Sequence, residues 1–469
     1  MYPGNRGRFN LNFSSAIFLF FFLPFAFLGD RFLGNTRARR PFLALAGLIF
    51  YAFGQLAGLA ILLLNAAVTW LAGRSIARGG HRAAAAGAIA FDLALLGAFK
   101  YLDFFTGSLN AAFGLALPSA GLVLPIGISF FTFKSISYLA DTARAPERGS
   151  AGFLDVLLYL SWFPEVTSGP ITRFSQFAEG LPTRRVTSEQ TARGLRRLTV
   201  GLARKLLIAG PVAAIADAAF GAAAPDFRLA WLGAAAYTIQ IYFDFSGYSD
   251  MAIGLGRMFG FHFLENFNYP YISRSVTEFW RRWHISLSTW FRDYVYIPLG
   301  GNRVPKGRWI LNILIVWTLT GFWHGAQWNF LLWGLYYAVL LLAEKLIWGK
   351  LLRKLPKLLQ WLYAMFFVVV GWVLFDLTDF AQLKYALGIM FSYTPTNWSL
   401  LLASDTTKLF SAIFIIPAIV FSFPVAKKLR VGDGTVSNVA VNIVCLLLLA
   451  ASIMFIISSS YNPFIYFRF

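Results

Sequence analysis

The chain has 469 residues, of which 58% are apolar and only 13% charged, and its net charge is +20. This composition excludes a disordered chain, and a water-soluble globule could not bury so much apolar surface. A single cysteine, Cys445, excludes an intrachain disulfide framework, so the remaining class is an all-α polytopic membrane protein.

Apolar runs recur along the whole chain. They cover 13–29, 41–53, 56–73, 83–102, 121–140, 153–171, 198–220, 229–255, 309–323, 327–348, 359–375, 381–391, 409–425 and 439–460. The first is expected to be an uncleaved span, because the residues after it lack a small-residue cleavage site. A spanning helix needs about 20 residues, so we expect about ten to twelve spans, with the shorter runs forming re-entrant or interfacial helices.

Lysine and arginine gather between the apolar runs, near 37–40, 74–82, 144–148, 173–197, 274–308, 350–357 and 427–430. This is the positive-inside pattern of a multi-pass protein of the cytoplasmic (inner) membrane, and it argues against binding to nucleic acid. If every cluster is cytoplasmic, both termini lie outside and 153–171 must enter and leave by the same face. Pro164, Glu165, Gly169 and Pro170 would interrupt a straight spanning helix there.

The chain shows no internal repeat and no soluble domain. We therefore expect one membrane domain over 1–469, with N-terminal helices in 1–120, a catalytic core in 121–348 and C-terminal helices in 349–469.

Two of the four histidines lie in patterns that make them candidates for an active-site role. His81 is in a basic loop and His262 ends an apolar run, so we expect no catalytic role for either. His284 lies in 278–294, where helical spacing places Arg281, His284 and Ser288 on one face and Trp280, Trp283, Leu287 and Trp290 on another. Such a helix lies at the membrane interface, and on spacing alone an interfacial anchor, in which His284 merely hydrogen-bonds, is the favoured interpretation over an active-site role.

His324 follows the apolar run 309–323, which is only about 22 Å long as a helix and therefore shorter than the ~30 Å hydrocarbon core. An ionisable side chain within the membrane is by default a functional candidate, although a buried structural histidine is the alternative. Neutral imidazole can take a proton from a hydroxyl and return it. Gly321 and Gly325 allow close backbone approach, and Asn329 adds a polar group nearby.

Asp244 and Asp250 interrupt the apolar run 229–255. Buried carboxylates need partners, and an ion pair that fixes helix packing is the favoured interpretation, with Arg281, Arg282 and Arg292 as the candidate cations. No metal site is predicted, because the two central histidines are 40 residues apart with no cysteine near them. P-loop, dinucleotide-binding and hydrolase-elbow motifs are absent from the sequence.

Several long motifs resemble the membrane-bound O-acyltransferase (MBOAT) family, in particular its alginate O-acetylation branch. They are 13–20 (FSSAIFLF), 124–133 (LPIGISFFTF), 168–174 (SGPITRF), 241–254 (IYFDFSGYSDMAIG), 265–271 (ENFNYPY), 278–294 (EFWRRWHISLSTWFRDY), 298–303 (PLGGNR), 321–326 (GFWHGA) and 462–469 (NPFIYFRF). The resemblance therefore covers nearly the whole chain.

The resemblance implies a helical bundle around a central tunnel, with His324 as the catalytic histidine and His284 as the second active-site histidine. It implies acetyl-CoA as a cytoplasmic donor substrate, no resident cofactor, and an extracytoplasmic partner of the SGNH-hydrolase type that modifies a polysaccharide. We expect the donor to contact Arg281, Arg282, Ser288, Asp244 and Asn329, since guanidinium groups suit the phosphates of CoA. His284 would position the donor or polarise its carbonyl.

Two other functions remain open from the sequence. A teichoic-acid D-alanyltransferase would take its acyl group from a carrier protein instead of CoA. A proton-coupled transporter would use Asp244, Asp250 and His324 as a relay, although the interrupted inverted repeats of transporters are not evident.

Overall fold

The computed structural model describes residues 11–79, 82–179, 181, 186–221, 226–393, 415–425 and 435–458. His81 and the C-terminal motif 462–469 lie outside the described residues. Within the described ranges the chain forms helices and no strand, as predicted. The α-helices are α1 Leu23–Leu33, α2 Arg39–Gly54, α3 Leu56–Gly79, α4 Arg82–Leu96, α5 Leu102–Phe113, α6 Ile128–Arg144, α7 Phe153–Ser161, α8 Phe174–Glu179, α9 Ser188–Ala203, α10 Gly210–Phe220, α11 Phe227–Met258, α12 Val276–Arg282, α13 Ile285–Phe291, α14 Lys306–His324, α15 Trp328–Ala343, α16 Gly349–Leu352, α17 Lys357–Asp376, α18 Phe380–Met390, α21 Ile415–Ser422 and α23 Thr435–Ser458.

Short π-helical and 3-10 segments join or precede several of these helices. The π segments are η1 Phe18–Phe22, η2 Gly97–Tyr101, η4 Arg204–Ala209, η6 Arg292–Tyr296 and η7 Glu344–Trp348, and the 3-10 segments are η3 Pro146–Arg148 and η5 Pro270–Ile272. Through η2 and η4, α4 continues into α5 and α9 continues into α10.

Six helical stretches in the described residues are long and apolar enough to cross a membrane. They are Leu56–Gly79, Ala83–Phe113, Ser188–Phe220, Trp328–Leu352, Lys357–Asp376 and Ser437–Ser458. The chain is therefore a multi-pass membrane protein, with fewer qualifying helices in its described part than the ten to twelve predicted.

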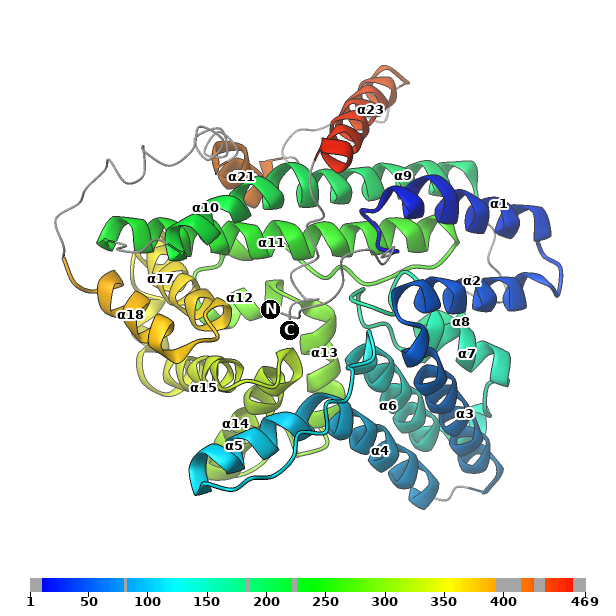
Figure 1. Ribbon diagram of the computed structural model, residues 1–469, viewed down its shortest axis with the longest axis horizontal. Coiled ribbons are helices and arrows are strands. Elements are labelled where there is room, and N and C mark those ends of the chain that lie inside the picture. Colours follow the sequence, from blue (N-terminus) through cyan, green and yellow to red (C-terminus); the bar gives the residue numbers. More distant parts are fainter. Residues whose placement is uncertain are drawn as a thin grey trace. The chain divides into compact units, whose positions relative to one another are not determined.

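The chain divides into two compact units, Met1–Leu198 with Ser249–Leu264, and Thr199–Tyr248 with Glu265–Phe469. These boundaries differ from 1–120, 121–348 and 349–469, and that three-part organisation remains a prediction. In the first unit α3, α4 and α6 lie side by side (Figure 1). The buried carboxylate of Asp92 on α4 joins them, because it accepts hydrogen bonds from Asn65 Nδ2 on α3 at 2.6 Å and from Ser135 Oγ on α6 at 2.5 Å. Such interhelical hydrogen bonds hold membrane helices together.

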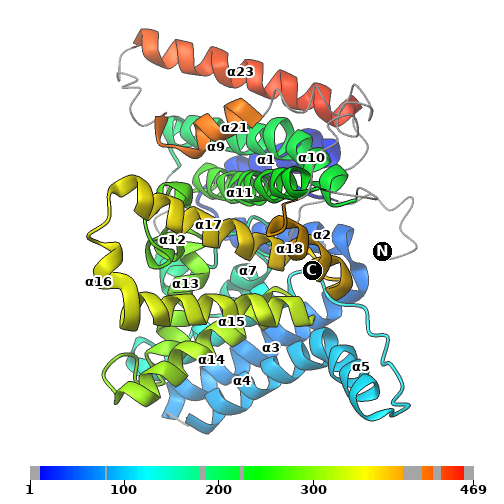
Figure 2. The same ribbon diagram turned by 90° about the vertical axis from the view of Figure 1, so that its left-hand side faces the viewer.

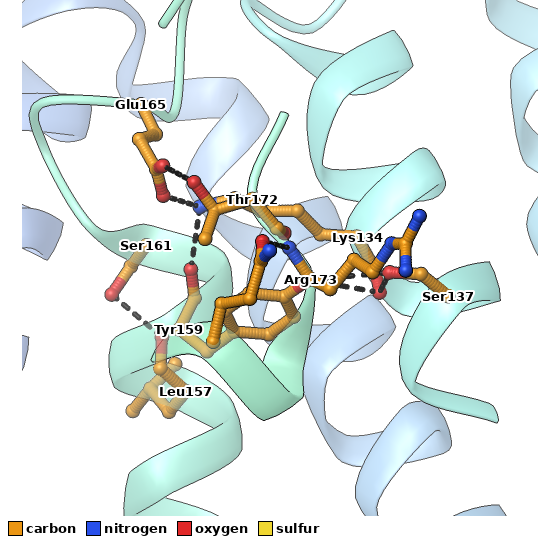
Figure 3. A network of polar contacts seen from close by, with 9 residues as sticks. Lys134, Ser137, Leu157, Tyr159, Ser161, Glu165, Thr172 and Arg173 are labelled. Atoms are coloured by element: carbon orange, nitrogen blue, oxygen red, sulfur yellow. Dashed lines mark hydrogen bonds and ion pairs between the residues drawn. The ribbon is translucent and has the colours of Figure 1, made fainter. Parts of the chain in front are cut away.

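The predicted interruption within 153–171 is present. Helix α7 has nine residues and ends at Ser161, so at about 1.5 Å per residue it is too short to cross a bilayer. Figure 3 shows how the segment after it is held: Lys134 Nζ donates to Glu165 Oε2 at 2.6 Å and to the carbonyl oxygen of Tyr159 at 2.9 Å. The hydroxyl of Thr172 also donates to Glu165. Which face of the membrane this segment enters remains a prediction.

Glycine is required where this segment meets α6. Gly127 has a φ of +71°, and a Cβ there would lie 1.9 Å from the carbonyl oxygen of Val166. The predicted apolar run began at residue 121, but the helix begins only at Ile128, directly after this left-handed residue. A residue with a Cβ would be strained in this conformation and would collide with that carbonyl oxygen, whereas glycine adopts it readily.

In the second unit α14 and α15 form an antiparallel pair, and α15 packs on α17 with α16 between them along the chain (Figure 2). Helix α17 in turn contacts α12 and α18. Asp244 on α11 pairs with Lys205 on η4 at 2.5 Å, and both side chains are buried. The predicted ion pair is therefore present, but its cation is Lys205 and not one of the three arginines proposed. Asp250, which belongs to the first unit, pairs with Arg197 at 2.8 Å.

Candidate functional site

His284 lies at a sharp break in the chain. The sequence predicted one helix through 278–294, and this is wrong: α12 ends at Arg282, α13 begins at Ile285, and η6 follows from Arg292. His284 between them has φ 45° and ψ 54°, the left-handed conformation that few side chains adopt. Helical periodicity therefore does not continue across this residue.

The break changes which side chains share a face. The four predicted apolar positions, Trp280, Trp283, Leu287 and Trp290, are all buried as expected. Arg281 and Ser288 are exposed, whereas His284 is only 1% exposed and packs against the ring of Phe245 on α11 with centroids 4.7 Å apart. The prediction that these three polar residues line one face is wrong, because the left-handed turn directs the imidazole inward.

Asn266 holds His284 in place. Asn266 Oδ1 lies 3.1 Å from His284 Nδ1 and accepts hydrogen bonds from the backbone N–H of Ser286 at 3.2 Å and from its hydroxyl at 2.9 Å. Backbone hydrogen bonds flank the histidine on both sides, from Ile285 N–H to the Asn266 carbonyl and from Asn268 N–H to the Arg282 carbonyl. The segment 266–268 thus runs beside 282–285 and stabilises the turn.

Burial also sets the charge of His284, which lies outside the six candidate spans. Removal from water disfavours the imidazolium form and lowers the pKa of His284 from 6.5 to about 3. The side chain is therefore neutral at physiological pH and carries a proton on only one ring nitrogen.

His324 is the last residue of α14 and is 5% exposed. Three aromatic rings stand nearly perpendicular to its imidazole: Trp323 at 5.0 Å, Trp333 of α15 at 5.0 Å and Phe375 of α17 at 5.1 Å between centroids. Such edge-to-face packing fixes the ring and keeps bulk water from its faces. The predicted close backbone approach is confirmed at Gly321, where a Cβ would lie 2.3 Å from the carbonyl oxygen of Phe330. At Gly325 the close neighbour is the ring of Phe330 and not the backbone.

The indole of Trp323 joins the two histidines. Its ring centroid lies 5.7 Å from the imidazole of His284 and 5.0 Å from that of His324. The two histidines, 40 residues apart in the sequence, are therefore neighbours across one indole. Residue spacing favoured a functional role only for His324, whereas the fold places both imidazoles against the indole of Trp323.

The other predicted contact residues lie in different surroundings. Asn329, buried in the first turn of α15, donates from Nδ2 to the carbonyl oxygen of Phe375 at 3.0 Å, and so lies beside the wall of His324. Arg282 pairs with Glu278 at 2.8 Å. Asp244 is occupied by Lys205 but precedes Phe245, the residue whose ring packs on His284. Arg281 and Ser288 are exposed on either side of the break.

Comparison with known proteins shows the family of the chain. Residues 128–381 match the profile described as MBOAT, membrane-bound O-acyltransferase family, a range that includes both histidines. The chain belongs to the membrane-bound O-acyltransferase family.

Curated relatives place it on the alginate O-acetylation branch of that family. A probable alginate O-acetylase of Azotobacter vinelandii is 38% identical over 97% of this chain and 100% of its own length. A peptidoglycan O-acetyltransferase of Helicobacter pylori is 32% identical over 98% of both chains. A teichoic acid D-alanyltransferase of Bacillus subtilis is 30% identical over 55% of this chain and 70% of its own. The protein is an O-acyltransferase, which decides against the transporter alternative.

Two residues of this membrane-bound O-acyltransferase were missed by the sequence reasoning. Asn266 was quoted only as part of a motif, and nothing in its own neighbourhood indicates that it meets a histidine 18 residues away. Glu344, which follows α15, accepts hydrogen bonds from the backbone N–H groups of Val276 at 2.6 Å and Thr277 at 2.9 Å, and so caps α12. A glutamate at the end of an apolar run was the available signal, because a buried carboxylate needs donors.

Proposed function

We propose that this O-acyltransferase passes an acetyl group from a cytoplasmic donor, acetyl-CoA, across the membrane for the O-acetylation of a cell-envelope polysaccharide. The observation that carries the proposal is that relatives matching nearly the full length of the chain are named probable alginate O-acetylase or peptidoglycan O-acetyltransferase. The D-alanyltransferase relative matches only 55% of this chain, so an acyl-carrier donor is less well supported.

In the proposed reaction His324 is the general base. The acceptor hydroxyl oxygen attacks the thioester carbonyl carbon, so that a C–O bond forms as the C–S bond breaks. His324 takes the hydroxyl proton and returns it to the departing thiolate, which leaves the enzyme unchanged at the end of the cycle. An imidazole walled by the rings of Trp323, Trp333 and Phe375 suits this role, because it is shielded from competing bulk water.

Two buried polar atoms on α15, the helix that follows His324 in the chain, support binding of a substrate near this histidine. Asn329 Oδ1 and Trp333 Nε1–H are buried and find no hydrogen-bond partner among the described residues. Buried polar groups in folded proteins are nearly always paired, so a water molecule or a polar substrate group is expected to supply the missing partners. We infer that these two atoms contact the reacting groups.

The donor and partner assignments follow the same proposal. The exposed guanidinium of Arg281 suits a CoA phosphate, with Arg282 and Ser288 nearby. Asp244 is a weaker candidate, because its carboxylate already pairs with Lys205. We propose that the enzyme acts in the cytoplasmic (inner) membrane, within a central tunnel, and hands the acetyl group to an extracytoplasmic SGNH-hydrolase-like protein.

Labelled donors test the proposal. Purified protein in lipid vesicles is supplied with radiolabelled acetyl-CoA or with a labelled D-alanyl carrier protein, together with a polysaccharide acceptor and the partner. Transfer of label from acetyl-CoA alone is expected, and His324→Ala should abolish it at an unchanged amount of inserted protein. His262→Ala is the matched control, because His262 is exposed and outside the proposed site. Transfer from the carrier protein alone would contradict the acetyl assignment, and full activity of His324→Ala would remove His324 from the mechanism.

A further inference from the structure

We infer that Asn266 is a positioning residue that fixes the proton of His284 on Nδ1 and so makes Nε2 the hydrogen-bond acceptor of the ring. The inference rests on the proposed function only in giving His284 an active-site role. Its structural part concerns three residues, Asn266, His284 and Ser286, which the motif-based reasoning did not connect.

The side-chain amide atom of Asn266 that faces His284 and Ser286 is the oxygen and not the nitrogen. The oxygen and nitrogen of an asparagine side chain have nearly the same shape, so their assignment follows from their hydrogen bonds. The backbone N–H of Ser286 can only donate, and it points to this atom of Asn266 at 3.2 Å. The atom must therefore be the carbonyl oxygen Oδ1, because the amide nitrogen would place two donors against each other.

The same contact determines which ring nitrogen of His284 carries the hydrogen. Asn266 Oδ1 lies 3.1 Å from His284 Nδ1, and a carbonyl oxygen can only accept. His284 Nδ1 must then carry the hydrogen. A neutral imidazole has one N–H, so Nε2 holds a lone pair.

This contact is also rigid. Asn266 is 1% exposed, and its Oδ1 also accepts from the Ser286 hydroxyl at 2.9 Å, so the amide cannot rotate without losing all three interactions. The left-handed backbone of His284 and the flanking hydrogen bond from Ile285 N–H to the Asn266 carbonyl hold the imidazole on the same side. The amide thus sets both the orientation and the tautomer of the ring.

This tautomer narrows the chemistry open to His284. Polarising the donor carbonyl requires an N–H directed at it, and in the neutral ring the only N–H is taken by Asn266. Nε2 can instead accept a hydrogen bond from a donor group of the substrate, such as an amide N–H, a hydroxyl or a thiol. His284 is therefore assigned to positioning a substrate by accepting a hydrogen bond, and its expected role in carbonyl polarisation does not fit this geometry.

Nitrogen NMR of the imidazoles tests the inference without any acyl transfer. The chain has four histidines, so a ¹⁵N-histidine-labelled sample in lipid gives few signals, and His284→Gln identifies those of residue 284. At pH 7.5 we expect a protonated Nδ1 and an unprotonated Nε2 for His284. A protonated Nε2 in the wild-type protein would overturn the inference, whatever the outcome of the acetyl-transfer assay.

Variants at 266 connect the tautomer to catalysis. Asn266→Leu removes the acceptor at similar volume, and we expect a mixture of tautomers. We also expect kcat/KM to fall by roughly tenfold to 100-fold, the range found when the hydrogen-bond partner that orients a functional histidine is removed. Asn266→Asp keeps the acceptor and adds a negative charge, which should restore the Nδ1–H tautomer and move an inflection of the pH–rate profile upward. Asn268→Leu, at an exposed position two residues along, should change neither measurement. A normal tautomer and normal kcat/KM in folded Asn266→Leu would contradict the proposed role.

Discussion

The ring centroids of Trp323 and His284 lie 5.7 Å apart, and the same indole also contacts the imidazole of His324, the next residue in the sequence. Because both imidazoles rest on one rigid side chain, the separation of the two histidines depends on the size of that side chain. Trp323 itself need not take part in any proton transfer.

Shortening Trp323 should therefore impair catalysis without abolishing the base. For Trp323→Leu we expect kcat to fall by roughly tenfold to 100-fold, because small displacements of reacting groups carry penalties of this size. Trp323→Phe should retain more activity, since an aromatic ring still separates the imidazoles. Steady-state acetyl transfer, normalised to inserted protein, measures both variants, and equal activity of Trp323→Leu and wild type would contradict the spacing role.

The neutral state of His284 predicts how stability depends on pH. Burial lowers its pKa in the folded protein to about 3, while in the unfolded chain it stays near 6.5. The unfolded state therefore binds a proton first as the pH falls, so the stability present above pH 6.5 is progressively lost between 6.5 and 3, at about 1.4 kcal/mol per pH unit. The variant His284→Gln lacks this pH-dependent contribution to the free energy of unfolding.

Thermal unfolding in detergent, followed by tryptophan fluorescence at pH 7.5 and pH 5, measures the difference. From pH 7.5 to pH 5, wild type should lose about 2 kcal/mol more than His284→Gln. An identical loss in the two proteins would mean that His284 is not buried in its neutral form.

The close approach of α14 and α15 predicts a position-dependent response to alanine. At Gly321 an added Cβ would lie 2.3 Å from the Phe330 carbonyl oxygen, whereas at Gly307 of the same helix it would meet nothing within 4 Å. Gly321→Ala should destabilise the protein by about 1–3 kcal/mol and displace His324. Gly307→Ala should be neutral or slightly stabilising. Unfolding of the two variants under the same conditions measures the difference in stability. An equal loss of stability in Gly321→Ala and Gly307→Ala would contradict the close approach of α14 and α15.

The buried pair of Lys134 and Glu165 predicts a large effect from losing one partner. Both side chains are at most 1% exposed, and their charged atoms lie 2.6 Å apart. Lys134→Met leaves a buried carboxylate without its cation and should cost about 3–5 kcal/mol, while the double variant Lys134→Met/Glu165→Met should recover part of that loss.

The surface pair Arg40 and Asp155 serves as the matched control, with atoms 3.1 Å apart and the arginine 42% exposed. Arg40→Met should cost less than about 1 kcal/mol, because solvent screens an exposed pair. If both lysine and arginine variants unfold alike, the network of Figure 3 does not hold the segment after α7.

The sequence predicted the features that depend on composition and local motifs. Helical class, multiple spans, the break after Ser161 and the small residues near His324 follow from apolar runs, prolines and glycines, all of which act locally. The left-handed turn at His284 could not be predicted in this way. No glycine or proline marks it, and the turn is stabilised by Asn266, which is distant in the sequence. The cation of Asp244 was misassigned for the same reason, because Lys205 reaches it through packing of η4 on α11.

Glu344 links the helix that follows His324 to the helix that precedes His284. Glu344 follows α15, the helix that begins four residues after His324. Its carboxylate accepts hydrogen bonds from the first residues of α12, the helix that ends two residues before His284. A shift of α15 along its own axis would therefore act on His284 and His324 together. The spacing of the two rings is therefore expected to depend on Glu344 as well as on Trp323.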